Sequence, residues 1–309
     1  MRVAIVGAGI AGLACGRALA RHDVQLFDKG RGPGGRMATR RVPRGDTTLH
    51  FDHGAQYFTA RDDRFRAVVK EWEREGVAAR WPAAGSEAFV GTPSMNAPVK
   101  ALAERADVRF ETKVDAVERR GASWHLVGDG IAGAPFDALV VAVPAEQAAP
   151  LLEDHAPNFA DCARRTNSSP CWTVMAAFAE PLPHGDILRD AGPIGWAARN
   201  NAKPGRGEEE CWVVQAGPDW SEAHLEDDPA DVAETLMAVF RERTGAAARP
   251  EYLAAHRWRY ARSGSADRDF LIDGEKRLGV CGDWMLGPRV ENGFVSGDRL
   301  GEALGEVLD

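Results

Sequence analysis

The stretch RVAIVGAGIAGL, residues 2–13, decides the fold of this 309-residue chain. Residues 2–6 are a short run rich in β-branched side chains, which is typical of a buried parallel strand. The glycine-rich turn after it opens an alanine-rich helix expected over about residues 10–20, and a second strand is expected over residues 24–27. In this strand–turn–helix–strand setting, the spacing G-x-G-x-x-G indicates a dinucleotide-binding site.

Each glycine of the motif has a physical role in holding a dinucleotide. Gly7 permits a tight turn, Gly9 lets a pyrophosphate approach the backbone, and Gly12 lets the helix lie close to the strand. The start of the helix offers unpaired N–H groups to the phosphates, and an acid after the second strand can accept a hydrogen bond from a ribose hydroxyl. The residues expected to contact the cofactor here are Gly7, Gly9, Ile10, Ala11, Gly12 and Asp28. The acid disfavours NADP, but the motif alone leaves NAD, FAD and a turn that binds nothing open.

The residues after Asp28, KGRGPGGRM at positions 29–37, favour FAD. A nicotinamide dehydrogenase normally continues from this strand into another crossover helix, which four glycines and a proline prevent here. An open backbone that ends in Gly-Gly-Arg suits a loop lying against a long, extended cofactor, whereas a flexible surface loop is the weaker alternative. We expect Lys29, Gly35 and Arg36 to contact the cofactor, with Arg36 facing its pyrophosphate.

The C-terminal end supplies a second, independent half of such a site. A strand is expected over residues 278–281, and a helix is expected from about residue 292 to 308. Asp283, just after the strand, is expected to bind the ribityl chain or a hydroxyl on the phosphate side of the cofactor. The start of the helix, at Gly293, Phe294 and Val295, is expected to direct its dipole at the pyrimidine edge of the flavin. A buried strand over residues 136–143 is the third element that one elongated flavin could reach.

These segments resemble a known family. GAGIAGL, FDKGRGPGGRMATRR, DHGAQYFTARD, NAPVK and GDWMLGPRVENGFVSGDRLGEAL are similar to the bacterial renalase-like flavoproteins, which belong to the wider amine-oxidase-like group. The resemblance covers about the first 120 and the last 60 residues, and DHGAQYFTARD is its most specific segment. It implies an α/β fold in which a Rossmann-like FAD-binding domain of the p-hydroxybenzoate hydroxylase type is interrupted by an α+β substrate domain with an antiparallel sheet.

Two interleaved domains follow from this organisation. The FAD-binding domain is expected at residues 1–60, 95–155 and 270–309, and the substrate domain, or lid, at residues 61–94 and 156–269. Within the lid, strands are expected at residues 168–180, 194–199, 211–215 and 257–260, and a helix at residues 231–241. Residues 203–210, KPGRGEEE, are expected to form a solvated loop.

The segment QYFTAR, residues 56–61, is expected to meet the substrate where the FAD-binding domain joins the lid. It offers an aromatic wall, a hydroxyl and a cation, which suit an anionic or nucleotide-like substrate, and the resemblance supports this role. The alternative is that its aromatic side chains belong to the core. The substrate contacts expected here are Gln56, Tyr57, Phe58, Thr59 and Arg61, and Ala55 and Gln56 are expected to touch the cofactor.

Further candidates lie on the lid and beside the flavin. Asn96 resembles a family position near the flavin, although it could equally be the N-cap of the next helix. Trp196 and Asn200 are expected on the lid side of the site, and His256 could accept or stabilise a proton, although a lone histidine on a strand is more often structural. The expected catalytic set is His256, Asn96 and Tyr57, and the expected substrate contacts also include Asn96, Trp196 and Asn200. Arg257 and Arg259 either hold substrate phosphates or pair with surface acids.

Composition excludes several other classes of protein. The chain has 38 Lys and Arg against 46 Asp and Glu, a net charge of −8, which argues against nucleic-acid binding. Its five cysteines form no C-x-x-C pair, so we expect reduced thiols in a cytoplasmic protein. No apolar run is long enough for a membrane span, the histidines lack metal-ligand spacing, and no nucleophile elbow indicates a hydrolase.

The resemblance also implies an activity. The substrates would be isomers of NAD(P)H reduced at the 2 or 6 position, which pass hydride to flavin N5 and leave as NAD(P)+. Oxygen would then be reduced to hydrogen peroxide, and the role would be metabolite repair. One alternative is an amine oxidase, although the chain has only three tyrosines from which to build an aromatic cage for an amine. The others are a flavin-binding module without turnover and a nicotinamide dehydrogenase, which the glycine-rich loop disfavours. The preferred isomer, the choice of NAD or NADP form and the oligomeric state stay open.

Overall fold

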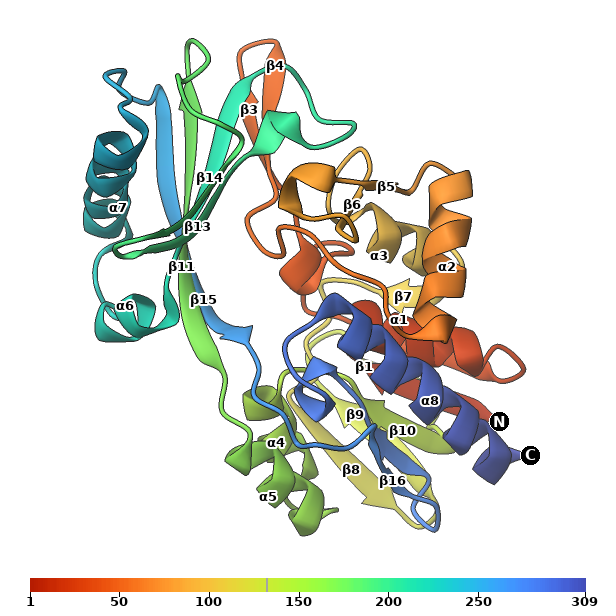
Figure 1. The fold of residues 1–309 in the computed structure, drawn as a ribbon. Coiled ribbons are helices and arrows are strands. Elements are labelled where there is room, and N and C mark those ends of the chain that lie inside the picture. Colours follow the sequence, from red (N-terminus) through yellow and green to blue (C-terminus); the bar gives the residue numbers. More distant parts are fainter. Residues whose placement is uncertain (132) are drawn as a thin grey trace.

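A six-stranded sheet carries the N-terminal motif. The computed structural model describes residues 1–131 and 133–309, and its larger sheet has the strand order β16-β17-β10-β1-β2-β7. The strands are β1 (Arg2–Val6), β2 (Asp23–Phe27), β7 (Asp107–Arg109), β10 (Ala138–Val141), β16 (Leu271–Asp273) and β17 (Leu278–Val280). All neighbours pair in parallel except β16, which is antiparallel to β17. The strands expected at both ends of the chain therefore lie in one sheet (Figure 1).

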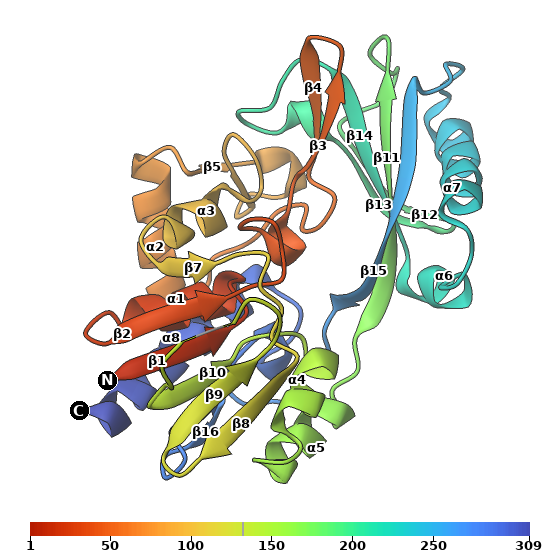
Figure 2. The same ribbon diagram turned by 180° about the vertical axis from the view of Figure 1, so that it is seen from behind.

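Alternate side chains of β1 enter two different cores. Val3 and Ile5 pack with α1 (Ile10–Ala18) and α8 (Val290–Leu308), whereas Ala4 and Val6 pack on the other face. That second face is covered by the hairpin β8 (Ala116–Arg120) and β9 (Ser123–Val127), and by α4 (Ala145–Leu152) and α5 (Pro157–Arg165) (Figure 2). A strand buried on both faces explains why residues 2–6 are apolar without alternation.

The lid is a five-stranded antiparallel sheet with the order β12-β13-β14-β11-β15. Its strands are β11 (Ser169–Phe178), β12 (Ile187–Ala191), β13 (Ile194–Arg199), β14 (Glu210–Ala216) and β15 (Tyr252–Arg262). The helices α6 (Pro218–Ala223) and α7 (Pro229–Thr244) lie along its outer face (Figure 1). Its other face packs against the hairpin β3 (Arg40–Arg44) and β4 (Thr47–Phe51). The fold class expected from the sequence is confirmed.

Three segments pack with a different domain from the one expected from the sequence. The helix α2 (Asp63–Arg74) and the strands β5 (Ala78–Arg80) and β6 (Phe89–Gly91) share a core with α1 and α8, although residues 61–94 were expected in the lid. The helix α5 also packs with the six-stranded sheet. Conversely, the hairpin β3 (Arg40–Arg44) and β4 (Thr47–Phe51) packs on β11 and β14 of the lid. The short helix α3 (Ala97–Ala103) lies beside α1.

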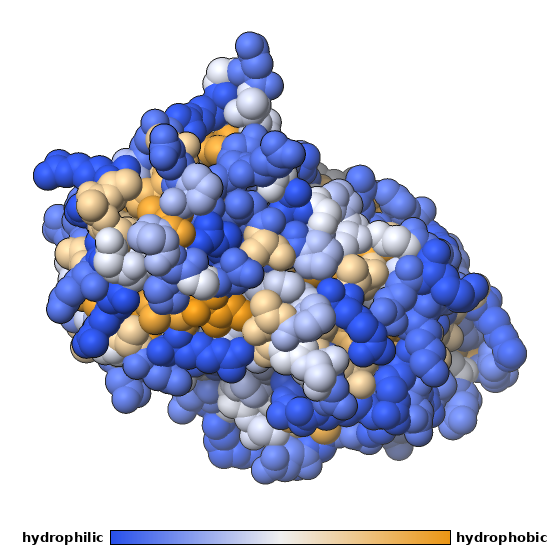
Figure 3. Space-filling view, turned by 45° about the horizontal axis from the view of Figure 1, so that its top comes forward, coloured by the Kyte–Doolittle hydropathy of each residue, from blue (hydrophilic) through white to orange (hydrophobic). Residues whose placement is uncertain are grey.

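No helix in the described part of the chain combines the length and apolar character that a membrane crossing requires. The surface in Figure 3 is mostly hydrophilic, with a hydrophobic strip on the left of the view, on the side of the five-stranded sheet.

Candidate functional site

In the glycine-rich turn, packing requires glycine at positions 7 and 12 but not at position 9. Gly7 has a φ of 105°, and a Cβ atom there would lie 2.6 Å from the carbonyl oxygen of Ala142. A Cβ atom on Gly12 would lie 2.0 Å from the oxygen of Gly7, whereas one on Gly9 would meet nothing within 4 Å. Gly9 is also the N-cap of α1, and no side chain caps that helix. Open space and free N–H groups at a helix N-terminus fit a bound phosphate.

Asp28 ties this turn to the loop that follows it. Its carboxylate accepts hydrogen bonds from the backbone N–H groups of Ala8, at 2.8 Å, and Gly30, at 2.7 Å. A carboxylate has about four acceptor positions, so a ribose hydroxyl can still bind beside these amides. Lys29, by contrast, is exposed and donates to Gln147 at 2.9 Å, on the first helical segment after β10.

The loop and the C-terminal half meet at an ion pair. Arg36, in the turn after the glycine-rich loop, lies 2.5 Å from Asp283, 247 residues away in the sequence. Ser263 donates a further hydrogen bond to Asp283 at 3.0 Å. The backbone N–H of Ala55 donates to the carbonyl oxygen of Arg36 at 2.8 Å. The segments that carry Arg36, Ala55 and Asp283, all expected to contact the cofactor, therefore lie close together. Gly35, which precedes Arg36, has a φ of 52°.

The helix α8 begins about two residues earlier than the sequence indicates, at Val290 and not near residue 292. Its N-cap, Arg289, makes no side-chain capping bond, so its first N–H groups are free for a ligand. Phe294 packs against Phe65 with ring centroids 5.1 Å apart and is fully buried. The N–H of Gly293 already donates to the carbonyl oxygen of Arg289 at 3.1 Å, so the free N–H groups of α8 lie before Gly293, earlier than the expected contacts at Gly293, Phe294 and Val295.

A row of five side chains crosses the inner face of the lid. Arg189 pairs with Trp196, Trp196 with Gln215, Gln215 with Thr173, and Thr173 with His256, each directly opposite the next on adjacent strands. Residues paired in this way point to the same side of a sheet. We call Arg189, Trp196, Gln215, Thr173 and His256 the lid row.

The lid row faces the segment His53–Tyr57. Gln215 donates to the carbonyl oxygen of Gly54 at 2.7 Å, and the rings of Tyr57 and Trp196 lie 5.5 Å apart. The imidazole of His256 lies 5.1 Å from that of His53. The space that a substrate would enter is therefore bounded by the lid row on one side and by residues 53–57 on the other.

Three of the expected substrate contacts, Phe58, Gln56 and Asn200, pack or form hydrogen bonds within the protein itself. Phe58 is buried and stacks on Phe89 at 5.9 Å, so it belongs to the core, which corrects the expectation of a substrate contact. Gln56 donates to the carbonyl oxygens of Asp52, at 2.5 Å, and Gly54, at 3.1 Å. Asn200 is also buried, and it bonds the backbone of β4 and of the residue after it. Thr59 stays half-buried beside Tyr57.

A buried ion cluster underlies residues 53–57. Asp52 lies 3.3 Å from the ammonium of Lys203 and 2.6 Å from the guanidinium of Arg206, and all three side chains are almost completely shielded from solvent. Thr39 donates to Asp52 at 2.6 Å, and Lys203 donates to Gln56 at 3.1 Å. The expectation of a solvated loop at residues 203–210 is therefore wrong for Lys203 and Arg206.

The cluster shifts the pKa values of its members. Burial alone would raise the pKa of Asp52, but the charges of Lys203 and Arg206 outweigh burial and hold it well below its usual range. Burial lowers the pKa of Lys203 to about 8, although Asp52 opposes that change. At pH 7 the cluster thus holds two cations and one anion.

His256 of the lid row and the neighbouring His53 are neutral at pH 7. Burial, together with the nearby His256 and Arg40, lowers the pKa of His53 to about 4. Burial, with Arg40, also lowers the pKa of His256. Trp258 donates to the carbonyl oxygen of His53 at 2.8 Å. A neutral imidazole at His256 can still accept a proton or a hydrogen bond.

The remaining candidates lie outside the space between the lid row and residues 53–57. Asn96 donates to the carbonyl oxygen of Pro33 at 3.2 Å and makes no capping bond, so its side chain braces the glycine-rich loop. Arg61 is exposed and lies 3.9 Å from Glu87. Arg257 and Arg259 both pair with Glu226, at 2.9 Å and 2.7 Å, which supports the surface-pair alternative over a grip on phosphates.

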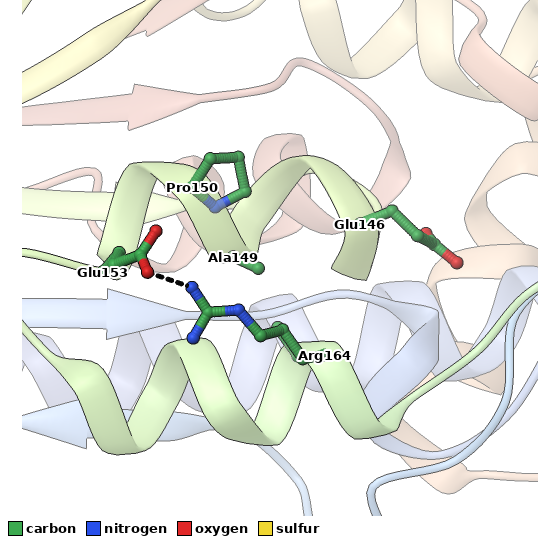
Figure 4. Close-up of a pocket in the computed structure, with 6 residues that line it drawn as sticks. Glu146, Ala149, Pro150, Glu153 and Arg164 are labelled. Carbon is green, nitrogen blue, oxygen red and sulfur yellow. Dashed lines mark ion pairs between the residues drawn. The ribbon is translucent and has the colours of Figure 1, made fainter.

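A hollow between α4 and α5 contains none of the expected site residues (Figure 4). It is crossed by an ion pair of 2.6 Å between Arg164 and Glu153. Its lining residues are Glu146, Ala149, Pro150, Glu153, Ala163 and Arg164. In the described part of the chain, this hollow included, His, Cys, Asp and Glu side chains form no group that could hold a metal ion.

Sequence reasoning missed Asp52, Lys203 and Arg206. The first two are 151 residues apart, and no spacing rule pairs positions at that distance. The one local signal was a Lys and an Arg that flank Pro-Gly just after a lid strand, which is also the composition of an ordinary exposed loop.

Comparisons with known proteins agree with this architecture. An NAD(P)-binding Rossmann-like domain matches residues 5–72, and a flavin containing amine oxidoreductase domain matches residues 76–300. Cyclohexylamine oxidase from Brevibacterium oxydans IH-35A superposes with a TM-score of 0.72 at 13% identity, covering 99% of both chains. A putative protoporphyrinogen oxidase from Exiguobacterium sp. 255-15 gives 0.70 at 12% identity, covering 99% of this chain and 98% of that one. A fatty acid isomerase from P. acnes gives 0.72 at 11% identity, covering 97% of both chains. At such identities the superpositions show a shared fold.

Proposed function

The chain belongs to the flavin containing amine oxidoreductase family, whose cofactor is FAD, and from that premise we propose that it oxidises dihydropyridine isomers of NAD(P)H. The isomers are those reduced at the 2 or 6 position of the ring. Each substrate gives up a hydride and leaves as NAD(P)+, and oxygen takes two electrons and two protons to become hydrogen peroxide, the second proton coming from solvent. The cellular role would be to return inhibitory isomers to the normal pool.

The residues of the N-terminal turn fit FAD. FAD supplies the two-electron redox chemistry when it is bound. The open space at Gly9 and the uncapped start of α1 would receive the pyrophosphate, and Asp28 would bind the ribose. Arg36 and Asp283, which already pair, would border the middle of the cofactor. The uncapped start of α8 would face negative charge on the ring.

The observation that carries the substrate proposal is the charge and shape of the space facing the lid row. Tyr57 and Trp196 offer two aromatic surfaces, and Arg189 lies over Trp196 at 4.6 Å. The lid row contains no carboxylate, and the buried cluster behind residues 53–57 has one positive charge in excess. A planar dihydropyridine attached to a pyrophosphate suits such walls better than a cationic amine does. Positioning of the ring for hydride transfer would raise the chemical rate, whereas uniform grip on the phosphates would lower KM.

An amine oxidase is the second candidate, because the family description names amines. An amine cage needs two facing aromatic rings, and Tyr57 with Trp196 could form one. Tyr252, however, stacks on Phe51 at 5.4 Å beneath the β3–β4 hairpin and is committed to the core there. A flavin-binding module without turnover is the remaining alternative, and redox behaviour distinguishes it.

The test is product formation in air. Purified FAD-loaded protein is incubated with 2-dihydro and 6-dihydro isomers of NAD(P)H, with ordinary NADH, and with a panel of primary amines. We expect hydrogen peroxide and NAD(P)+ in equal amounts from an isomer and none from NADH or the amines. Peroxide from amines alone would favour the amine oxidase, and peroxide from no donor would favour the binding module.

A further inference from the structure

Trp196 of the lid row and the neighbouring Trp81 carry indole N–H groups that are shielded from solvent and find no hydrogen-bond acceptor among the described residues. Trp81, directly after β5, is 2% exposed, and Trp196 lies in β13. Their ring centroids are 6.5 Å apart, and the ring of Tyr57 lies 5.5 Å from that of Trp196. Buried donors are nearly always paired in folded proteins, because an unpaired one loses its bonds to water. Two unpaired donors in one corner therefore point to an acceptor that binds there.

The charges around this corner favour an electron-rich group. The ammonium of Lys203 lies 5.4 Å from the centroid of Trp81, and the guanidinium of Arg189 lies 4.6 Å from that of Trp196. Asp52 balances only one of the two cations, Lys203 and Arg206, that share it. Lys203 keeps its proton at pH 7, because its pKa is lowered only to about 8. Arg189 donates to the carbonyl oxygen of Ala84 and meets no carboxylate within ion-pair distance among the described residues.

We propose that Trp81 and Trp196 form an acceptor subsite, in which their indole N–H groups bind the oxygen of a carboxamide or carboxylate carried by a planar ring. That ring would rest against Tyr57. The subsite deepens the proposed function, since a dihydronicotinamide carries such a carboxamide at the 3 position. It excludes a protonated amine from the same corner, because an ammonium group has no lone pair for the N–H donors and is repelled by Lys203 and Arg189.

Three pyridines of nearly equal shape test the subsite without any turnover. Nicotinate carries a carboxylate, nicotinamide a neutral carboxamide and 3-(aminomethyl)pyridine an ammonium group. Each is titrated at pH 7 into the full-length, FAD-loaded protein, and binding is followed by calorimetry and by the change in flavin absorbance. We expect nicotinate to bind at least about tenfold more tightly than 3-(aminomethyl)pyridine, as one unit charge about 10 Å away at an effective dielectric constant of about 20 would give. Nicotinamide should lie between them.

Variants assign the effect to the two donors. Trp81→Phe and Trp196→Phe keep an aromatic ring but remove the N–H, and each should weaken nicotinate and nicotinamide by about threefold to tenfold with FAD content unchanged. The matched control is Trp220→Phe, since Trp220 stacks on His224 at 4.1 Å, on the outer side of the lid. Lys203→Met should reduce the preference for nicotinate over nicotinamide by about tenfold. It leaves Asp52 paired with Arg206, so the cluster becomes neutral.

Equal or tighter binding of 3-(aminomethyl)pyridine would overturn the subsite, as would Trp81→Phe and Trp196→Phe proteins that bind all three probes as the Trp220→Phe protein does. If Trp81→Phe fails to fold, Trp196→Phe decides alone, because Trp196 is only half-buried and its replacement disturbs the core less than that of Trp81. Probe binding as expected, together with failure of the dihydro isomers to form NAD(P)+, would uphold the subsite and contradict the proposed function. Formation of NAD(P)+ without these probe preferences would uphold the proposed function and contradict the subsite.

Discussion

Gly9 and Gly12 lie three residues apart and lack side chains for different reasons. A Cβ atom at position 9 meets nothing within 4 Å, whereas one at position 12 would lie 2.0 Å from the carbonyl oxygen of Gly7. The motif spacing predicted a role for each glycine, and the structure separates the position that leaves open space from the one that packing requires.

A pair of alanine variants tests this distinction. Gly9→Ala should leave the stability of the apoprotein within about 0.5 kcal/mol and weaken FAD binding by at least about tenfold, because the new methyl group occupies the space of a phosphate. Gly12→Ala should destabilise the apoprotein by about 1–3 kcal/mol through overpacking. Denaturant unfolding of apoprotein and FAD titration measure both effects. Unchanged FAD affinity in Gly9→Ala would remove the pyrophosphate from this turn.

Asp52 is the single anion between two buried cations. Asp52→Asn leaves Lys203 and Arg206 unbalanced, and we expect it to cost about 3–5 kcal/mol of folding stability. Lys203→Met leaves the pair of Asp52 and Arg206 intact, so its cost should be much smaller. Urea unfolding of the two variants side by side gives the comparison. Equal losses would mean that the balance of charge in the cluster does not govern stability.

His53 should make the protein sensitive to acid. Burial holds its pKa at about 4 in the folded chain, below its ordinary value of 6.5. Between these two values the unfolded chain binds the proton first, so stability falls as the pH drops from about 6.5 to 4. The wild type should lose up to about 3 kcal/mol more over that window than His53→Phe does. Unfolding free energies measured from pH 7 to pH 4 decide this, and parallel pH curves would contradict the assignment.

The two ends of the chain are joined by one helix pair. A Cβ atom on Gly297 of α8 would lie 2.0 Å from the carbonyl oxygen of Ala11 in α1, so the helices touch through their backbones. Because α1 carries the glycine-rich turn at its start, the position of α8 fixes that turn. Each helix was expected from sequence, but their contact was not, since small residues in a helix do not say what lies against them.

Two glycines of α8 provide a controlled test of this contact. Gly297→Ala should push α8 from α1, lower the stability by about 1–3 kcal/mol and weaken FAD retention. At Gly305 a Cβ atom would reach only 3.8 Å from Leu19, an ordinary contact. Gly305→Ala should therefore stabilise the helix by about 0.5–1 kcal/mol. Thermal unfolding and the FAD content of purified protein measure the outcome, and a neutral Gly297→Ala would disprove the close contact.

The limits of sequence reasoning also show at this scale. The strands β11, β13 and β14 fell close to their expected bounds, because β-branched and aromatic runs mark them. The strand β15 begins five residues before its expected start, and β12 was not expected. The strand order and the lid row depend on register between strands as far apart as β12 and β15, which no local pattern encodes. The start of α8 was placed late because Arg289 is not a capping residue type, so no N-cap signal marked Val290.

At the scale of the whole molecule, the site lies where two sheets meet. The glycine-rich turn follows β1 of the six-stranded sheet, residues 53–57 follow the β3–β4 hairpin, and the lid row contacts residues 53–57 from the opposite side. The buried cluster of Asp52, Lys203 and Arg206 links the two across this join. Fold and cofactor followed from motifs at the two ends of the chain. The substrate wall did not, because it is assembled from segments that only folding brings together.

Anaerobic mixing tests the central claim most directly. The FAD-loaded protein is mixed with an equal amount of each dihydro isomer of NAD(P)H, in the absence of oxygen, and the oxidised flavin band is followed. We predict rapid and complete bleaching by an isomer, with one NAD(P)+ formed per flavin, and no bleaching by ordinary NADH or by amines. Bleaching by amines, or by no donor at all, would contradict the account.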